Sequence, residues 1–566
     1  MFDDSRPLIV QRDCTVLLEV RNNQFAEARN LLSGIAYLVK SPLQLYTYRI
    51  TPLSLWNAAA AGMKEHEIIE KLRSYSKLPL PGSVEAEIRK HMGRYGCIRL
   101  EPDGGRLRLA CGNEDVMNQL LAFSSLSSYM SRVDGSSLSL SVEPQFRGIV
   151  KRELTRLGFP VIDLAGYHDG ESLPIRLRKF TSGGKPFQLR DYQLEAVEAF
   201  YRKDSVYEGS GVLVLPCGAG KTVVGIAAMA RLNTATLILT SSVTSVRQWK
   251  KELLDKTDLN EQTIGEYCGP SKTVRPVTIA TYQILTHRKS SDDEFVHMKL
   301  FNERDWGLII YDEVHLLPAP VFRVTAGIQA TRRLGLTATL VREDGCEEDV
   351  FSLIGPKCYD VPWRQMEERQ WISEAVCREI RVPFSGQSLE EYRRAGAREK
   401  HRIAGENPAK ILAVQDLLRK HAGDRILIIG QYISQLEQLA SELNAPLICG
   451  KVRHEQREAI YDRFNQGEIP VLVVSRVANF AVDLPDANVA IQVSGSFGSR
   501  QEEAQRLGRI LRPKQGGNQS FFYSLVTLDS SEQEFSLKRQ LFLVEQGYRY
   551  ETKTVNEAAQ VGMVSL

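Results

Sequence analysis

The first feature of the chain that could do chemistry is a glycine-rich loop leading into a lysine and a threonine. The apolar stretch 212–215 runs into Pro216-Cys217-Gly218-Ala219-Gly220-Lys221-Thr222, and a helix-like stretch follows. Glycines let backbone N–H groups turn toward a phosphate, and a helix start adds partial positive charge. Lys221 is placed to reach the β and γ phosphates of ATP, and Thr222 to bind Mg²⁺. Leu215 replaces the usual first glycine, so a generic turn is the alternative, but the strand–loop–helix context favours ATP binding.

A second candidate group is acidic. The apolar stretch 308–311 ends in Asp312, Glu313 and, two residues on, His315. Ligands of open α/β sheets lie beyond the carboxyl ends of the strands, which is where these side chains are expected. Asp312 would hold Mg²⁺, and Glu313 would orient and deprotonate the attacking water in phosphoryl transfer. A capped surface turn is the alternative interpretation.

The elements that must position these residues follow a repeated pattern of short apolar runs and helix-like stretches. Short apolar runs separated by helix-like stretches are typical of parallel strands covered on both faces. The first series lies at 212–215, 236–240, 277–280, 308–311 and 334–336, and the second at 425–430, 446–449, 471–475, 489–493 and 521–526. We therefore predict an α/β protein with two tandem parallel-sheet domains, 185–370 and 371–550, and a tail over 551–566.

The region before these domains has a mixed α+β pattern. Extended stretches over 8–20 and a helix over 24–40 precede helical stretches at 53–61, 64–75 and 84–95 and a hairpin around the turn 102–105. Three helices and a hairpin predict a winged-helix-like module within 1–112, which would bind DNA or protein or serve as a packing domain. Residues 113–180 are predicted as a second mixed module, a candidate for recognising DNA or its damage, with helices over 113–131 and after Pro144. Turn-prone residues at 181–186 mark a domain boundary.

Composition limits the possible classes of protein. The 566 residues include 72 basic and 69 acidic side chains, a net charge of +3, so the overall charge does not indicate nucleic-acid binding. We find neither an apolar run long enough to span a membrane nor a secretory signal. The nine cysteines form no CxxC pair, which favours reduced core cysteines in a cytoplasmic protein over a metal site.

Several motifs in a fixed order resemble a known family. Residues 187–193 (FQLRDYQ), 216–222, 312–315 (DEVH), 337–339 (TAT) and 505–513 (QRLGRILRP) together resemble a superfamily-two helicase. Arg342-Glu343-Asp344 resembles the RED motif of the XPB DNA repair helicases, and the stretches 51–62 and 538–548 also resemble that family, closest to its bacterial branch. The resemblance implies RecA-like domains and an ATP-dependent DNA helicase or translocase of 3′→5′ polarity in nucleotide-excision-type repair.

The resemblance also implies roles for single residues. Arg190 and Gln193 would contact adenine, and Asp483 would contribute to the nucleotide site. Arg509 and Arg512 would act as arginine fingers. Hydrolysis would be coupled to unwinding by a larger set: His315, Thr337, Thr339, Arg342, Glu343, Asp344, Gln505 and Arg506. The alternatives are a helix cap at Gln193, sheet packing of the threonines, a surface salt-bridge cluster at the RED triplet, and a Glu502–Arg506 pair within one helix. Ala478-Asn479 departs from the eukaryotic pattern near Asp483.

DNA contacts are predicted in two regions. By resemblance, Arg247, Trp249 and Thr281 would grip the strand backbone. The basic stretch 388–402 resembles a short thumb insertion, with Arg393, Arg394 and Arg398 as phosphate contacts or, alternatively, as a solvated helix face. The implied partners are DNA at a single-strand/duplex junction and a nuclease or other repair protein. The protein is expected to be a monomer associated with the nucleoid in the cytoplasm.

Three other functions fit parts of this pattern. A duplex translocase that remodels complexes without separating strands is the nearest, because it needs the same motor. An RNA helicase remains open because no residue pattern reads a 2′-hydroxyl. A scaffold with a vestigial motor is disfavoured by the presence of Lys221, Asp312, Glu313 and Arg509.

Overall fold

The structure, a computed structural model, describes residues 3–41, 44–133, 136–202, 208–269, 271–288, 295–329, 331–340, 345–361, 363–475, 487–495, 499–508, 510–511, 518–546, 548 and 550–555. The chain divides into two units. The first unit is Met1–Leu215 with Gly220–Asp360, and the second is Val361–Leu566 with Pro216–Ala219. No helix in the described part of the chain is long and apolar enough to cross a membrane.

The first unit begins with a small antiparallel sheet and four helices. The strands are β1 (Leu8–Val10), β2 (Thr15–Glu19), β3 (Tyr37–Lys40) and β4 (Leu45–Arg49), in the order β1-β2-β4-β3. The helices are α1 (Phe25–Ile35), α2 (Pro52–Ala60), α3 (Glu65–Tyr75) and α4 (Gly82–Arg94). Thr51 caps the start of helix α2, because its hydroxyl accepts a hydrogen bond from Ser54 N at 3.2 Å, and Pro52 occupies the first helical position.

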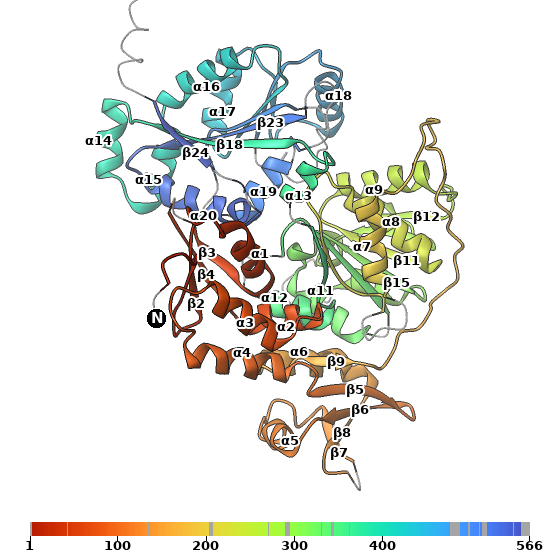
Figure 1. Ribbon diagram of the computed structural model, residues 1–566. Coiled ribbons are helices and arrows are strands. Elements are labelled where there is room, and N and C mark those ends of the chain that lie inside the picture. The colour runs from red at the N-terminus through yellow and green to blue at the C-terminus, as the bar shows by residue number, and fades with distance from the viewer. Residues whose placement is uncertain are drawn as a thin grey trace, which may run out of the picture. The chain divides into compact units, whose positions relative to one another are not determined.

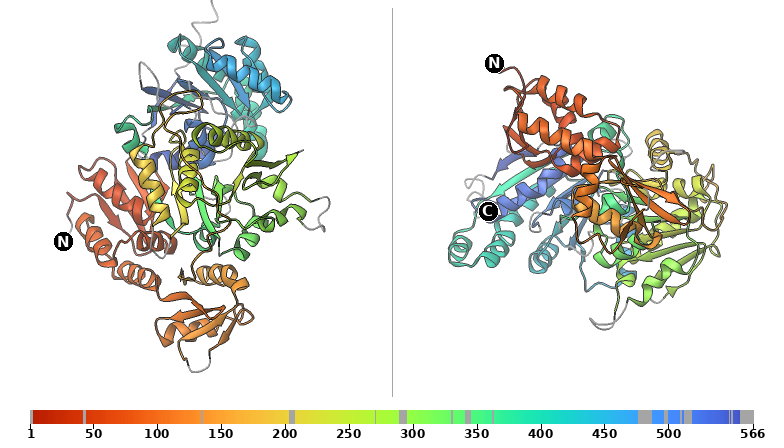
Figure 2. Two further views of the ribbon diagram at one scale, coloured as in Figure 1. Left: turned by 90° about the vertical axis from the view of Figure 1, so that its right-hand side faces the viewer. Right: turned by 90° about the horizontal axis from the view of Figure 1, so that it is seen from below.

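A separate five-stranded sheet follows (Figures 1 and 2). Its strands are β5 (Ile98–Asp103), β6 (Arg106–Cys111), β7 (Met130–Arg132), β8 (Ser139–Val142) and β9 (Val161–Asp163), in the order β7-β8-β6-β5-β9. Helices α5 (Glu114–Leu121) and α6 (Arg147–Arg156) accompany it. The helix expected over 113–131 ends at Leu121, because its last residues form the β7 strand instead.

This sheet corrects the winged-helix expectation. The predicted hairpin exists as β5 and β6, but β6 pairs with β8 and β5 pairs with β9. Both hydrogen-bonding edges of the hairpin are therefore occupied by strands that lie after residue 112. A boundary at 112 would cut this sheet, so the hairpin is the centre of the second module and not a wing on α2–α4.

The first parallel sheet has eight strands in the order β13-β12-β14-β11-β15-β16-β10-β17. Five match the predicted runs: β10 (Ser210–Val214), β11 (Thr236–Thr240), β14 (Val277–Thr281), β15 (Leu308–Asp312) and β16 (Arg332–Thr337). Three were not predicted: β12 (Ile264–Cys268), β13 (Ser271–Lys272) and β17 (Lys357–Asp360). All neighbouring strands run parallel except β12 and β13.

Helices cover both faces of that sheet. Alternate strand residues such as Leu237 and Leu239 share a buried cluster with α10 (Tyr282–Leu285), α11 (Ala319–Gly327) and α12 (Glu347–Leu353). The remaining helices are α7 (Asp191–Tyr201), α8 (Lys221–Leu232) and α9 (Val243–Lys256). Burial on both faces explains why these strands read as continuous apolar runs.

The expected boundary segment at 181–186 is attached to this first domain. Ser182 N donates to Asp255 Oδ1 of α9 at 2.9 Å, and Leu177 forms a β-bridge with Thr257. Turn-forming composition therefore marks a connecting segment here, but one that is hydrogen-bonded along its length to the domain that follows.

The second unit contains a seven-stranded sheet in the order β20-β21-β19-β22-β23-β18-β24, all parallel (Figure 1). The strands are β18 (Glu374–Val382), β19 (Ile426–Gly430), β20 (Leu447–Ile448), β21 (Val471–Ser475), β22 (Val489–Gln492), β23 (Gln519–Thr527) and β24 (Tyr550–Thr554). The structure thus confirms the predicted α/β class with two parallel-sheet domains. It corrects the tail, because β24 pairs with β18 and brings Tyr550–Thr554 into the sheet.

The helices of this unit are α13 (Trp363–Glu368), α14 (Gly386–Arg394), α15 (Ala397–Gly405), α16 (Ala409–Lys420), α17 (Ile433–Glu442), α18 (His454–Asn465), α19 (Arg500–Gly508) and α20 (Ser531–Glu545). Figure 1 shows α16 and α17 on one face of the sheet and α15 and α20 on the other. The predicted thumb-like stretch corresponds to the helix pair α14 and α15.

Candidate active site

The phosphate loop connects β10 to α8 through two glycines in a conformation that favours glycine. Gly218 and Gly220 have φ angles of +83° and +77°. A Cβ on Gly220 would stand 2.8 Å from Gln193 Nε2 and would be strained by the positive φ angle. Left-handed glycines before a helix turn backbone N–H groups inward, which is the geometry that cradles phosphate. The donor set therefore fits the triphosphate of a nucleotide.

The acidic pair lies within reach of the lysine that follows this loop. Lys221 Nζ is 3.4 Å from Glu313 Oε1. Strand β15 ends at Asp312, and Glu313 adopts a left-handed φ of +51°, which turns the chain sharply after the strand. A non-glycine residue in this region costs roughly 1–3 kcal/mol and is often found at functional sites. Burial and the neighbouring Glu313 carboxylate raise the pKa of Asp312 to about 6.

The acidic box is connected to the predicted coupling threonines. His315 is buried, and its Nδ1 lies 2.7 Å from Thr337 Oγ1. The Thr337 hydroxyl in turn donates to the Thr339 carbonyl, and Thr339 N donates back to Thr337 Oγ1. The DEVH and TAT stretches are therefore in direct contact. Thr337 and Thr339 are also buried, as the sheet-packing alternative expects, and their role in coupling stays a prediction.

Trp249 is placed differently from the expectation of a DNA contact. Its side chain is 1% exposed, and its Nε1 donates to Asp312 Oδ2 at 2.9 Å. A buried indole that bonds a carboxylate inside the domain has no surface to offer to a DNA strand. The signal was present in the sequence, because Val246, Trp249 and Leu253 recur at helical spacing and form the buried face of α9.

Thr281 also lies inside the domain. Its side chain is 4% exposed, and its hydroxyl accepts a hydrogen bond from Ile284 N at the start of α10. The threonine therefore caps a helix, and the expected contact with the DNA backbone is not compatible with its burial. Arg247, in contrast, is exposed on the outer face of α9, beside Lys250 and Lys251.

The predicted adenine contacts form a helix cap. Arg190 N donates to Gln193 Oε1 at 3.0 Å, in a capping box at the start of α7. The helix cap that was the alternative for Gln193 is therefore present. The Nε2 atom of Gln193 lies beside Gly220 of the phosphate loop. Recognition of adenine by Arg190 and Gln193 stays a prediction.

The helix α19 carries Gln505 and Arg506 in the second unit. Arg506 is 1% exposed and contacts Glu502 at 3.2 Å and Gln492 in its own domain. The predicted alternative of a Glu502–Arg506 pair is therefore present, and Arg506 is directed into the core. Arg509, Arg512, Asp483 and the triplet Arg342-Glu343-Asp344 lie outside the described residues, as does Ala478-Asn479, and their roles stay predictions.

The basic residues of the thumb-like insert are exposed. Arg393 and Arg394 end α14, and Arg398 lies in the first turn of α15. Arg394 Nη2 is 3.7 Å from Glu390 in the same helix, whereas Arg393 and Arg398 have no ion-pair partner among the residues that the structure describes. These two guanidinium groups are available to bind phosphate.

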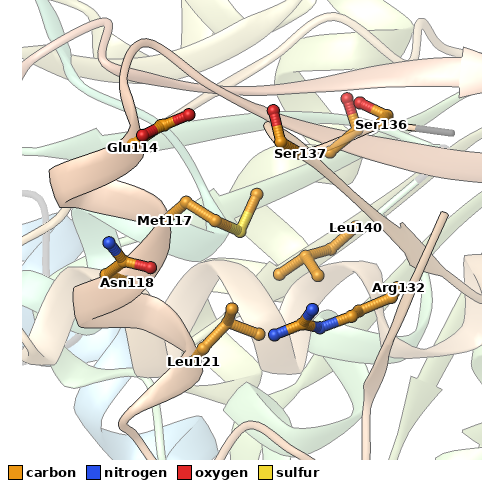
Figure 3. A pocket seen from close by; sticks show the side chains of 9 residues that line it. Glu114, Met117, Asn118, Leu121, Arg132, Ser136, Ser137 and Leu140 are labelled. Carbon is orange, nitrogen blue, oxygen red and sulfur yellow. The ribbon is translucent and has the colours of Figure 1, made fainter.

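The five-stranded module has a hollow of its own (Figure 3). Met117, Leu121, Leu140 and Arg132 point toward one another across it, with Glu114, Asn118, Ser136 and Ser137 around them. The polar groups come from α5 and from the β7–β8 region. Recognition of DNA or its damage by this module stays a prediction.

Family models match three stretches of the chain. Residues 366–563 match "ERCC3/RAD25/XPB C-terminal helicase", residues 8–133 match "Helicase conserved C-terminal domain", and residues 186–342 match "Type III restriction enzyme, res subunit". All three descriptions belong to proteins that act on nucleic acid or to helicase domains. The first and third cover the two parallel-sheet domains.

Similar proteins match the chain over almost its whole length. It is 50% identical to "DNA 3'-5' helicase XPB" of Mycobacterium tuberculosis, covering 96% of this chain and 97% of that protein. It is 48% identical to the protein of the same name in Kineococcus radiotolerans, with 96% of each covered. It is 33% identical to "General transcription and DNA repair factor IIH helicase/translocase subunit XPB" of Encephalitozoon cuniculi, covering 97% of this chain and 82% of that protein.

Among solved structures, the "ATP-dependent Type ISP restriction-modification enzyme LlaBIII bound to DNA" is similar with a TM-score of 0.50 and 14% identity. The match covers 66% of this chain and 32% of that one. At this identity the similarity concerns the fold alone.

Proposed function

Since the chain belongs to the XPB family of helicases, we propose that it is an ATP-hydrolysing DNA helicase that moves in the 3′→5′ direction. One observation of the site carries this proposal. The phosphate-loop lysine lies beside the acidic box, and the acidic box contacts the TAT stretch through His315 and Thr337. A nucleotide site connected in this way is suited to transmit the state of the nucleotide to the rest of the domain.

Each side chain of this site has a distinct task. The left-handed glycines and Lys221 bind and orient the triphosphate. Thr222 and Asp312 would hold Mg²⁺, which supplies charge neutralisation at the phosphates when bound. Glu313 positions the attacking water and accepts its proton. Arg509 and Arg512 stabilise the charge that develops in the transition state.

The proposed repair role has a matching set of partners. The name of the Encephalitozoon cuniculi relative includes DNA repair, and we propose DNA at a junction between duplex and single strand as the substrate, with a nuclease or other repair protein as the partner. We assign the protein this substrate, a monomeric state and a cytoplasmic, nucleoid-associated location.

The test is a DNA-stimulated ATPase assay combined with unwinding of duplexes that carry either a 3′ or a 5′ single-stranded overhang. The expected result is ATP turnover that DNA stimulates more than RNA does, with displacement of the strand only from the 3′-overhang substrate. Stimulation by RNA alone would contradict the choice of DNA. A scaffold with a vestigial motor would show no ATP turnover at all.

The nearest alternative needs its own measurement. A duplex translocase would displace the third strand of a triplex without separating the duplex. Triplex displacement in the absence of unwinding would therefore replace the helicase proposal with translocation.

A further inference from the structure

Helix α9 has two faces with different surroundings. Val246, Trp249 and Leu253 form its buried face, whereas Arg247 and Lys251 are exposed. The helix follows β11, which is a neighbour of β15 in the sheet. Its inner face packs on β11, β12 and β14, and the long side chain of Trp249 reaches across to Asp312 at the end of β15.

The indole of Trp249 contacts two parts of the nucleotide site at once. A Cβ on Gly225 would stand 2.5 Å from Trp249 Cη2, so the indole packs against the backbone of α8, the helix that begins with Lys221. At its other end, Nε1 donates to Asp312 Oδ2 at 2.9 Å. An indole N–H is a donor only, so it pairs with a carboxylate oxygen and with no metal.

We propose that Trp249 is a positioning residue that holds the Asp312 carboxylate in the orientation that binds Mg²⁺. The inference rests on the proposed function, because it assumes that Asp312 is the metal-binding carboxylate. The Asp312 carboxylate also receives a hydrogen bond from the Glu313 backbone, and Trp249 is the side chain that holds its Oδ2 atom. Partners that orient a metal-binding side chain typically change metal affinity or activity by roughly 10- to 100-fold when they are removed.

The position of Trp249 also connects metal binding to α9. The same helix carries the exposed Arg247 on its outer face. The Asp312 carboxylate is therefore linked to α9, a helix outside the phosphate loop. The link is the single hydrogen bond from Trp249 Nε1.

The direct test replaces Trp249 by Phe in the full chain, which keeps an aromatic ring and removes the N–H donor. Binding of a fluorescent ADP is measured over a range of Mg²⁺ concentrations, and binding of Mn²⁺ with ADP is followed by electron paramagnetic resonance. We expect the metal concentration at which ADP binding changes by half of its full range to rise by roughly 10- to 100-fold. Binding of ADP in the presence of a chelator should remain at the wild-type level.

Two comparisons separate the hydrogen bond from packing. Trp306 is a matched control, because it is 2% exposed in the same unit and its Nε1 donates to the Leu300 carbonyl at 3.0 Å. Trp306→Phe should lower thermal stability without changing the metal dependence. Replacement of Trp249 by 3-benzothienylalanine, which has sulfur in place of N–H, keeps the shape of the indole and should reproduce the metal defect of Trp249→Phe.

The outcomes are distinct. Wild-type metal dependence in the benzothienylalanine protein overturns the inference, and so does an equal metal defect in Trp306→Phe. If the wild-type protein itself shows no metal-dependent binding of nucleotide, the proposed function fails instead. A metal defect confined to the two variants at position 249 supports the positioning role.

Discussion

The two parallel-sheet domains use their charged residues in different ways. In the first, Lys221 and Glu313 keep 11% and 19% of their side chains exposed while lying 3.4 Å apart. In the second, Lys410 and Glu532 form a pair that is 1% exposed on both sides, and Arg539 pairs with Glu503 at 3.4 Å with similar burial. The first arrangement leaves charges accessible for a ligand, whereas the second satisfies them inside the protein.

The free-energy cost of burying a charge explains why the buried residues of the second domain are paired. A buried charge costs several kcal/mol unless it is paired, and burial lowers the pKa of Lys410 while Glu532 opposes that shift. Pairs of this kind join distant segments of the second unit, because Lys410 lies in α16 and Glu532 in α20. Of these pairs, the one in the first domain keeps part of its charge exposed, and the one in the second domain is buried on both sides.

The largest effect is expected from Lys221→Ala. ATP turnover should fall below detection, because the β and γ phosphates lose their lysine. The thermal midpoint should change little, since the lysine is accessible and belongs to the site and not to the core. A kinetic ATPase assay and circular dichroism measure the two quantities. Wild-type turnover would remove the nucleotide site from the first domain.

Arg509→Ala tests whether the second domain contributes a residue to ATP hydrolysis. If Arg509 is an arginine finger, turnover should fall by roughly 10³–10⁵-fold while DNA affinity is largely kept. Steady-state ATPase and fluorescence anisotropy with labelled DNA measure these effects. Wild-type turnover with weakened DNA binding would identify a phosphate contact, and the chemistry would then belong to the first domain alone.

Glu313→Gln separates binding from catalysis within the first domain. The amide keeps the size of the side chain but accepts no proton, so turnover should fall by roughly 10²–10⁴-fold. Equilibrium binding of ATP should remain. Collapse of ATP affinity together with turnover would show that Glu313 organises the site and does not act as the base.

Glu532→Gln tests the buried ion pair between Lys410 and Glu532. An uncompensated Lys410 should lower the stability of the protein by about 3–5 kcal/mol, measured as a shift of the urea midpoint. The double change Lys410→Met with Glu532→Leu should recover only part of that loss, because the Val493 carbonyl and the Thr527 N–H then lose their buried partners. Glu437→Gln is the control, because its pair with Lys451 is exposed and contributes less than about 1 kcal/mol. Equal losses in the two single variants would contradict the comparison.

The smallest effect concerns the exposed arginines of the second unit. Combined Arg393→Ala and Arg398→Ala should weaken DNA binding and lower the slope of log affinity against log salt by roughly one for each phosphate that the variant no longer binds. Arg419→Ala is the control, since Arg419 is exposed but paired with Asp416. An unchanged slope in the double variant would identify α14 and α15 as an ordinary solvated surface.

Local patterns were sufficient for much of the fold. The continuous apolar runs predicted four of the five strands that carry or flank the nucleotide site, β10, β11, β15 and β16, because strands buried on both faces must be apolar throughout, and they missed β17 beside β10. The glycine-rich loop and the acidic box were predicted at the carboxyl ends of β10 and β15. Strand order in a parallel sheet then brings them together, as the 3.4 Å contact between Lys221 and Glu313 shows.

The sequence patterns did not predict strands at sheet edges or strands whose residues are only partly buried. The β18 and β24 strands alternate buried and exposed residues or are largely exposed, so no continuous apolar run marks them. The hairpin of β5 and β6 was found from its turn, but its partners β8 and β9 lie far along the chain. Pairing between distant segments leaves no local signal, and the winged-helix expectation failed for that reason.

The two-domain α/β plan, the nucleotide loop and the acidic box can be predicted from the amino-acid sequence, because each follows from side-chain chemistry and spacing within a few residues. The contacts of Trp249, Thr281 and Arg506 depend instead on tertiary packing. All three are polar or amphipathic residues that a surface motif and a buried network use equally well. Their roles depend on which side of a helix or strand faces the core, and packing between segments far apart in the chain sets that side.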